Sequence, residues 1–161
     1  MGAPLPAGYH WYTRPAATAG KARSFTLAVP AGWQPRQRGT ATYLWNPASG
    51  AIISVSPAPA AAGSPTWQAR VLKRVGLGRG ALASYRRITS APFLSHGRLA
   101  GAWRFTYQQP GTGAVDGLVV VTQANAAGGG SYELTATAPV RYWLATGIAF
   151  AEAVRTFSPA A

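Results

Sequence analysis

The sequence predicts an α+β fold in which helices pack on the faces of an antiparallel β-sheet. Three observations predict it. Tyr132, Leu134 and Ala136 alternate with polar residues, as in a strand that has one solvent-exposed face. Directly after Pro139, apolar residues recur at spacings of three and four, which is typical of a helix that lies on a sheet. The 19 glycines and 13 prolines among 161 residues indicate many turns, and therefore many strands.

The N-terminal part of the chain predicts a lead-in followed by strands. Residues 1–8 are rich in Pro, Ala and Gly, which predicts a disordered segment before a single domain over residues 9–159. The first strands are expected where aromatic, β-branched or alternating residues gather, and they span residues 9–13, 24–29, 40–45 and 51–56.

The segments between these strands predict turns and loops. Pro30 and Gly32 end the second strand, and Trp33 is expected to fold back onto the core. Residues 34–39 predict an exposed loop that carries Arg36 and Arg38. The next two strands are expected to pair as a hairpin around residues 46–50.

The second half of the chain predicts a helix, further strands and a final helix. Ser64 and Pro65 are suited to the N-cap and first position of a helix over residues 66–77. Strands are expected over residues 85–89, 98–109 and 117–122, and the last of these is apolar enough to be covered on both faces. The inward stripe of the final helix is expected to contain Val140, Trp143, Leu144, Gly147, Phe150, Ala151 and Val154.

The charge balance is strongly basic. Fifteen Lys and Arg residues oppose three acidic residues, for a formal net charge of +12. Such a surface attracts polyanions, namely nucleic acid, anionic lipid head groups or anionic envelope polymers. The alternative explanation is a compositional bias toward Arg, Ala and Gly. Cysteine is absent, which excludes disulfides and thiolate metal sites, and no stretch reaches the roughly 18–20 apolar residues of a membrane span.

No combination of residues predicts catalysis. Asp116 resembles a turn residue, Glu133 falls on the expected wet face of its strand, and Glu152 is placed to form a surface pair with Arg155. The histidines at positions 10 and 96 are too few to form a metal site with scattered acids. We therefore expect no enzyme activity in this segment, no catalytic residues, no cofactor and no metal.

A nucleic-acid site is the second functional hypothesis. Stacking platforms for single strands interleave aromatic residues and Arg on one exposed face. In this sequence the aromatic residues are expected on the apolar faces of the strands and the arginines on the opposite faces. Arg predominates over Lys among the basic residues, which favours bidentate contacts to phosphate or carboxylate wherever an anion binds.

Several short motifs resemble a known family when they are taken in order. They are Trp11-Tyr12, the segment FTLAVPAGW at residues 25–33, YRRI at 85–88, WRFTY at 103–107, YEL at 132–134, Pro139 with Trp143, and Thr156-Phe157. Together they resemble PsbP-like domains, above all the extracytoplasmic C-terminal domains of actinobacterial membrane-anchored serine/threonine protein kinases and related lipoproteins. The resemblance implies an antiparallel sheet between helices, a PsbP-like α/β/α sandwich.

The same resemblance implies a function. It implies a non-catalytic extracytoplasmic sensor or binding domain of a membrane-anchored serine/threonine protein kinase, present here as an excised fragment or processed protein. The expected partner is an anionic cell-envelope component or another protein, and the alternative is a basic nucleic-acid-binding protein. The candidate anion contacts are Arg86, Arg87, Arg98 and Arg104.

Overall fold

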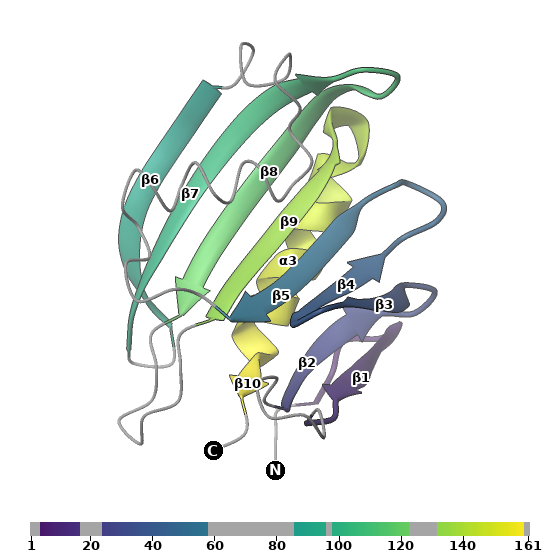
Figure 1. Cartoon of the computed structure of the whole chain (residues 1–161), viewed down its shortest axis with the longest axis vertical. Helices are drawn as coiled ribbons and strands as arrows, with labels where there is room; N and C mark the ends of the chain where they lie inside the picture. Colours follow the sequence, from purple (N-terminus) through teal and green to yellow (C-terminus); the bar gives the residue numbers. More distant parts are fainter. Residues whose placement is uncertain (1–3, 17–23, 58–85, 96–97, 123–131, 160–161) are drawn as a thin grey trace.

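Two antiparallel sheets and one α-helix make up the part of the chain that the computed structural model describes (Figure 1). That part comprises residues 4–16, 24–57, 86–95, 98–122 and 132–159, with the backbone alone described for residues 86–95, 98–101 and 103. The predicted α+β class is confirmed, since the sheets are antiparallel and the C-terminal helix packs on them. The helix predicted over residues 66–77 lies outside the described residues.

The smaller sheet joins the two ends of the domain. It contains β1 (Tyr9–Arg14), β2 (Phe25–Pro30) and β10 (Ser158–Pro159), in the order β1-β2-β10. The first two strands lie where the sequence predicted them. The short β10 pairs with the start of β2, so the C-terminal residues are held against an N-terminal strand.

The larger sheet has seven strands in the order β3-β4-β5-β9-β8-β7-β6. Strand β9 is inserted between β5 and β8, so it joins the N-terminal hairpins to the β6–β8 meander. The seven strands are β3 (Gln34–Arg38), β4 (Ala41–Trp45), β5 (Ile52–Pro57), β6 (Arg86–Ser95), β7 (Arg98–Gln109), β8 (Gly113–Thr122) and β9 (Tyr132–Pro139).

Two strand predictions need correction. Residues 34–38 form the edge strand β3, although the sequence predicted an exposed loop, because Gly39 has a positive φ of 60° and turns the chain back so that β3 pairs with β4. Asp116 was predicted at a turn, but the turn after β7 is short and β8 already begins at Gly113. Asp116 therefore lies inside β8, where it is buried.

The C-terminal helix begins directly after β9, as predicted. A 3₁₀ turn, η1 (Val140–Tyr142), leads into α3 (Trp143–Thr156). The buried face of α3 consists of Thr146, Ala149, Phe150 and Ala153, so the predicted inward stripe is only partly right. Leu144 is 79 % exposed, because the helix turns its small residues toward the sheet and β2 and its larger aliphatic residues outward.

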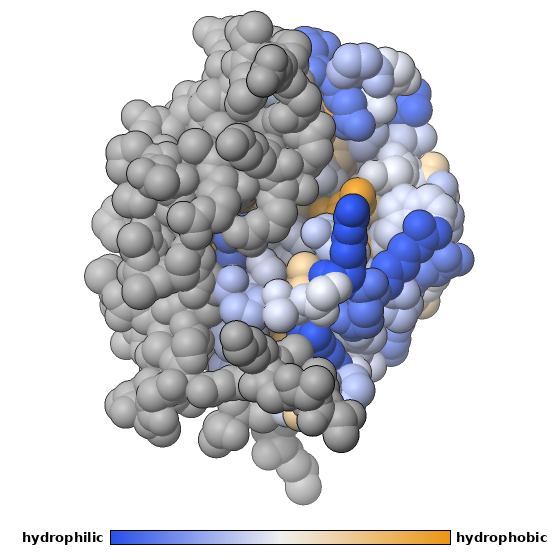
Figure 2. Space-filling model, viewed as in Figure 1, coloured by the Kyte–Doolittle hydropathy of each residue, from blue (hydrophilic) through white to orange (hydrophobic). Residues whose placement is uncertain are grey.

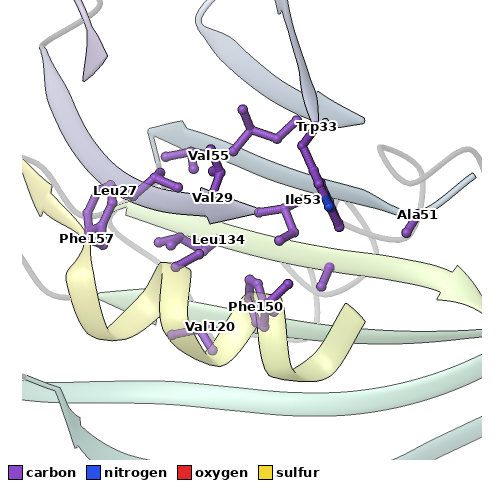
Figure 3. Packing of buried hydrophobic residues seen from close by; sticks show 14 of the residues in the cluster. Leu27, Val29, Trp33, Ala51, Ile53, Val55, Val120, Leu134, Phe150 and Phe157 are labelled. Atoms are coloured by element: carbon purple, nitrogen blue, oxygen red, sulfur yellow. The ribbon is translucent and has the colours of Figure 1, made fainter. Parts of the chain in front are cut away.

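The main core lies between α3 with β2 on one side and the central strands of the large sheet on the other (Figure 3). Figure 1 shows α3 passing behind β5 and β9, so the core fills the rear face of the sheet in that view. Trp33 packs into this cluster, which confirms the prediction that it folds back. The labelled members are Leu27, Val29, Trp33, Ala51, Ile53, Val55, Val120, Leu134, Phe150 and Phe157.

Strand β9 has no wet face over most of its length, which corrects the prediction from its alternating pattern. Glu133 and Thr135 are each only 3 % exposed, and the Thr135 hydroxyl donates to a carboxylate oxygen of Glu133 at 3.4 Å. β9 is also paired along both edges, with β5 and β8. A central strand can be buried on both faces even when one face carries polar residues that have hydrogen-bond partners.

Candidate anion-binding surface

The backbone places the four predicted arginines at two ends of the β6–β7 hairpin. Arg86 lies opposite Thr106 and Arg87 opposite Phe105, close to Arg104 on β7. Arg98 lies at the other end of the hairpin, opposite Ser95 and six residues from Arg104, which is about 20 Å along a strand. The sheet therefore brings three of the four positions to one region and separates the fourth. Their contact with an anion stays a prediction.

Arg104 is committed to contacts within the domain. One guanidinium nitrogen donates to a carboxylate oxygen of Asp116 at 3.3 Å, and its Cζ lies 5.4 Å from the ring centroid of Trp143. The carboxylate is buried, with 8 % of its side chain exposed, whereas the Arg104 side chain is 39 % exposed. Nε of Arg104 is buried and has no hydrogen-bond partner. These contacts tie the start of α3 to β7 and β8, so a structural role accounts for this arginine.

A second group of basic residues, which the sequence did not single out as a site, lies on β3. All five residues of β3 are exposed, including Arg36 and Arg38. The register places Arg36 opposite Tyr43 and Gln34 opposite Trp45. Because directly opposed residues share a face of an antiparallel sheet, these side chains lie on one side of it. The guanidinium carbon of Arg36 is 4.4 Å from the ring centroid of Trp45.

This arrangement corrects the expectation that arginines and aromatic residues lie on opposite faces. Tyr43 and Trp45 are half-buried on the face that β4 turns away from the core, whereas Leu44 between them is fully buried in the core. The alternation along β4 was visible in the sequence, but the apolar face was assigned to the aromatic residues. In the structure Leu44 lies on the core face of β4, so Tyr43 and Trp45 lie on its outward face.

The strand pairing extends this face of the sheet from β4 onto β5 and β9. One row runs from Trp45 through Ile52 to Thr137, and the next runs from Tyr43 through Ser54 to Thr135. Figure 2, which views the molecule from the side opposite α3, shows strongly hydrophilic side chains projecting over β3 and β4. We call this surface the β3–β5 face, and we define it by Arg36, Arg38, Tyr43, Trp45 and Ser54 together with Thr137 of the adjacent strand β9.

The charge of the β3–β5 face is positive. Both of its arginines are exposed, and none of its six residues is acidic. The nearest acid along the same face of β9 is Glu133, which lies one row beyond Thr135 opposite Ser56 and is buried. Two guanidinium groups beside flat rings and hydroxyl groups can bind a carboxylate or phosphate and contact the apolar side of its carrier.

The three acidic residues of the chain lie on three different elements. Asp116 pairs with Arg104, and Glu133 is buried in β9. Glu152 accepts two hydrogen bonds from Arg155, at 2.5 and 2.9 Å, which confirms the predicted pair. The hydrogen bond from Arg155 lowers the pKa of Glu152, and burial opposes that shift. Within the described part of the chain, no cluster of three or more His, Cys, Asp or Glu residues is placed to hold a metal.

The chain matches a family model over most of its length. Residues 18–159 match the family described as the serine/threonine kinase C-terminal domain. The comparison with curated protein sequences finds no significant match. Among the described helices, none is long and apolar enough to cross a membrane.

Solved structures share the fold at low sequence identity. Cyanobacterial PsbP from Synechocystis sp. PCC 6803 is 14 % identical, with a TM-score of 0.58 over 99 % of this chain and 97 % of that one. LpqN of Mycobacterium tuberculosis, described as involved in cell envelope biogenesis, is 13 % identical, with a TM-score of 0.55 over 95 % and 92 %. The Saccharomyces cerevisiae Ran-binding protein Mog1p is 13 % identical, with a TM-score of 0.55 over 92 % and 96 %. These likenesses confirm the PsbP-like fold.

Proposed function

Because the chain belongs to the serine/threonine kinase C-terminal domain family, we propose that it is a non-catalytic sensor domain that binds a ligand for a larger kinase. In this proposal, residues 9–159 form one domain behind a lead-in of residues 1–8. The domain lies outside the cytoplasm, on the outer face of the membrane that anchors its kinase. Its ligand is an anionic component of the cell envelope.

The proposed location has two supports. The motifs that resemble extracytoplasmic kinase domains span nearly the whole chain. A solved structure with the same fold, LpqN, is described as involved in cell envelope biogenesis. A test in intact cells follows from this location. Protease added outside the cells should cleave this domain when the full kinase is produced, while a cytoplasmic reporter stays intact.

The anionic nature of the ligand is supported above all by the β3–β5 face. Its exposed Arg36 and Arg38 stand on a chain whose formal net charge is +12. Exposed guanidinium groups without acidic neighbours repel one another and favour an anionic partner. Among the four predicted contacts, the structure describes the side chain of Arg104 alone, and this guanidinium group is already paired with Asp116.

One observation favours the alternative, a nucleic-acid-binding protein. Arg36 stacks on Trp45, and Tyr43 lies on the same face, so cationic and aromatic side chains are interleaved there. Proteins that bind single strands without sequence preference use such surfaces. The two hypotheses differ in the dependence of binding on salt and on the chemistry of the polyanion.

A panel of polymers separates these hypotheses. Binding of the purified domain is measured by isothermal titration calorimetry at about 0.15 M salt, where non-specific electrostatic attraction is already screened. We expect binding to at least one of three anionic envelope mimics: polyglycerol phosphate, polygalacturonate or vesicles containing anionic lipid. Neutral dextran and an oligo-dT strand should not bind. Failure of all three mimics refutes the proposal, and salt-resistant binding of oligo-dT establishes the alternative.

A further inference from the structure

We propose that the β3–β5 face binds an acidic oligosaccharide, with its acidic groups on Arg36 and Arg38 and a sugar ring against Tyr43. This inference rests on the proposed function and narrows its ligand from any anionic envelope component to a chain of sugars with carboxylate groups. Three features carry it. They are the orientation of Arg36, the spacing of the two arginines, and the mixture of rings and hydroxyl groups beside them.

Contact with Trp45 favours one placement of the Arg36 guanidinium group before any ligand arrives. Its guanidinium carbon lies 4.4 Å from the Trp45 ring centroid, within the range of a cation–π contact. The N–H groups that point away from the ring can then donate to an acceptor. A carboxylate can accept two parallel hydrogen bonds from such groups. Trp45 therefore acts as a positioning residue for Arg36.

The spacing of the arginines selects a ligand with more than one acidic group. Arg36 and Arg38 are two residues apart on one strand, so their side chains leave the same face about 7 Å apart at the backbone. A single sugar acid engages one guanidinium group. A chain of acidic sugars engages both, and the second contact forms at high effective concentration.

The remaining residues of the face suit a sugar. Tyr43 lies directly opposite Arg36 and is half-buried, so part of its side chain is open to a ligand. The negative face of an aromatic ring attracts the polarised C–H groups on the flat side of a pyranose. Ser54 lies opposite Tyr43, and Thr137 lies in the next row, and both are partly exposed. Their hydroxyl groups can exchange hydrogen bonds with the hydroxyl groups of a sugar.

Other polyanions fit this face less well. Strand addition by an acidic peptide is opposed because the edge strand β3 contains Pro35, which has no N–H to donate to an added strand. Among the residues whose burial is described, the large exposed apolar side chains that would enter a bilayer lie elsewhere, on β1, η1 and α3. The interleaved Arg36 and Trp45 that favour nucleic acid also limit it, because Arg36 lies over the Trp45 ring and leaves Tyr43 as the second ring of this face, whereas single-strand binders stack successive bases. A sugar acid does not need the Trp45 ring face, because its carboxylate can accept hydrogen bonds from Arg36 while its ring lies against Tyr43.

The test compares galacturonate with trigalacturonate on the purified domain. Binding is measured by isothermal titration calorimetry at about 0.15 M salt. We expect trigalacturonate to bind at least about tenfold more tightly than the monomer, because two guanidinium groups are engaged. Arg36→Gln or Arg38→Gln should each weaken trigalacturonate binding about tenfold, which corresponds to about 1.4 kcal/mol. Either change should also remove the preference for the trimer.

Matched variants separate the face from the net charge. Arg141 is exposed on η1 and also stacks on an aromatic ring, with its Cζ 4.8 Å from the Tyr142 centroid. Arg141→Gln therefore removes the same charge and the same kind of contact away from the β3–β5 face, and it should change binding less than about twofold. Tyr43→Ala should weaken binding, whereas Tyr43→Phe should keep most of it. Thermal unfolding of each variant checks that the fold is intact.

The possible outcomes distinguish this inference from the proposed function. If polygalacturonate binds but Arg36→Gln and Arg141→Gln weaken it equally, the site inference fails and an anionic ligand remains. If polyglycerol phosphate or anionic vesicles bind while trigalacturonate does not, the saccharide class is wrong. If a neutral trisaccharide or oligo-dT competes as well as trigalacturonate, the acidic saccharide is refuted. If no anionic mimic binds, the proposed function itself fails.

Discussion

A single methyl group added at Gly117 should destabilise the domain. Gly117 lies in β8 directly opposite Phe105 in β7, and the Phe105 ring covers the glycine. A Cβ built at Gly117 would lie 2.9 Å from Cε1 of Phe105 and closer still to two other ring atoms. Cβ atoms in proteins essentially never come within 3.0 Å of another heavy atom. Phe105 is fully buried, so its ring cannot move aside into solvent.

The size of the effect follows from two opposing contributions. Overpacking a buried site costs about 1–3 kcal/mol, since side chains leave their rotamers or the strands shift apart. Replacing glycine by alanine in a regular element returns about 0.5–1 kcal/mol, because the unfolded chain loses freedom. We therefore expect Gly117→Ala to lower the free energy of unfolding by about 1–2 kcal/mol, and Tm by about 2–8 °C for a chain of this size.

Gly147 provides the matched control. It lies inside α3, and a Cβ built there meets no heavy atom within 4 Å. Gly147→Ala should therefore raise the free energy of unfolding by up to about 1 kcal/mol, since alanine favours helix more than glycine does. Both variants are measured by urea unfolding and by calorimetry. A loss of stability at position 117 together with a gain at position 147 separates the clash with Phe105 from the general effect of replacing glycine by alanine.

A second change tests whether Phe105 is the cause. In a Phe105→Leu background, the alanine at position 117 should cost less, and a double-mutant cycle should show a coupling of about 1 kcal/mol. The reasoning is refuted if Gly117→Ala is as stable as the wild type. It is also refuted if the cost at position 117 is unchanged by Phe105→Leu.

Two further predictions concern buried polar groups. Burial raises the pKa of Tyr107 above its ordinary value of 10.0, because it disfavours the ionised phenolate. The folded domain therefore holds the phenol proton more tightly than the unfolded chain. The stability that depends on this proton is complete below pH 10.0 and is lost as pH rises through the folded-state pKa. Tyr107→Phe should flatten the alkaline loss of stability in urea unfolding, and an identical pH profile would contradict this. Asp116→Asn removes the charged partner of Arg104 and should cost about 1 kcal/mol. Hydrogen exchange at the start of α3 should become faster, because Arg104 contacts Trp143 there; unchanged protection would show that the pair does not hold the helix.

Local patterns in the sequence were sufficient to locate most of the described elements. The strand over residues 98–109 and the hairpin around residues 46–50 were predicted nearly to the residue, as was the passage from strand to helix at Pro139. Each of these depends on neighbours in the chain. Residue periodicity, the missing N–H of proline and the turn-forming residues act over a few positions, so a single sequence contains the information.

The candidate site was less accessible to sequence reasoning, because it depends on register. Arg36 and Trp45 are nine positions apart, and the turn at Gly39 determines that they meet. The sequence emphasised Arg104 instead, whose guanidinium group is paired with Asp116 across two strands. That pairing removes it from the surface charge that composition alone predicts.

The sequence by itself determined where strands and the final helix form, that the chain is basic, and which family it belongs to. Only the tertiary structure decided which face of each element is wet. Glu133 is buried although it is charged, and Leu144 is exposed although it is apolar, since α3 packs through its small residues. Burial depends on which layers meet, and layers are brought together by residues far apart in the chain. The alternation that forms a strand is the same whichever of its faces is covered.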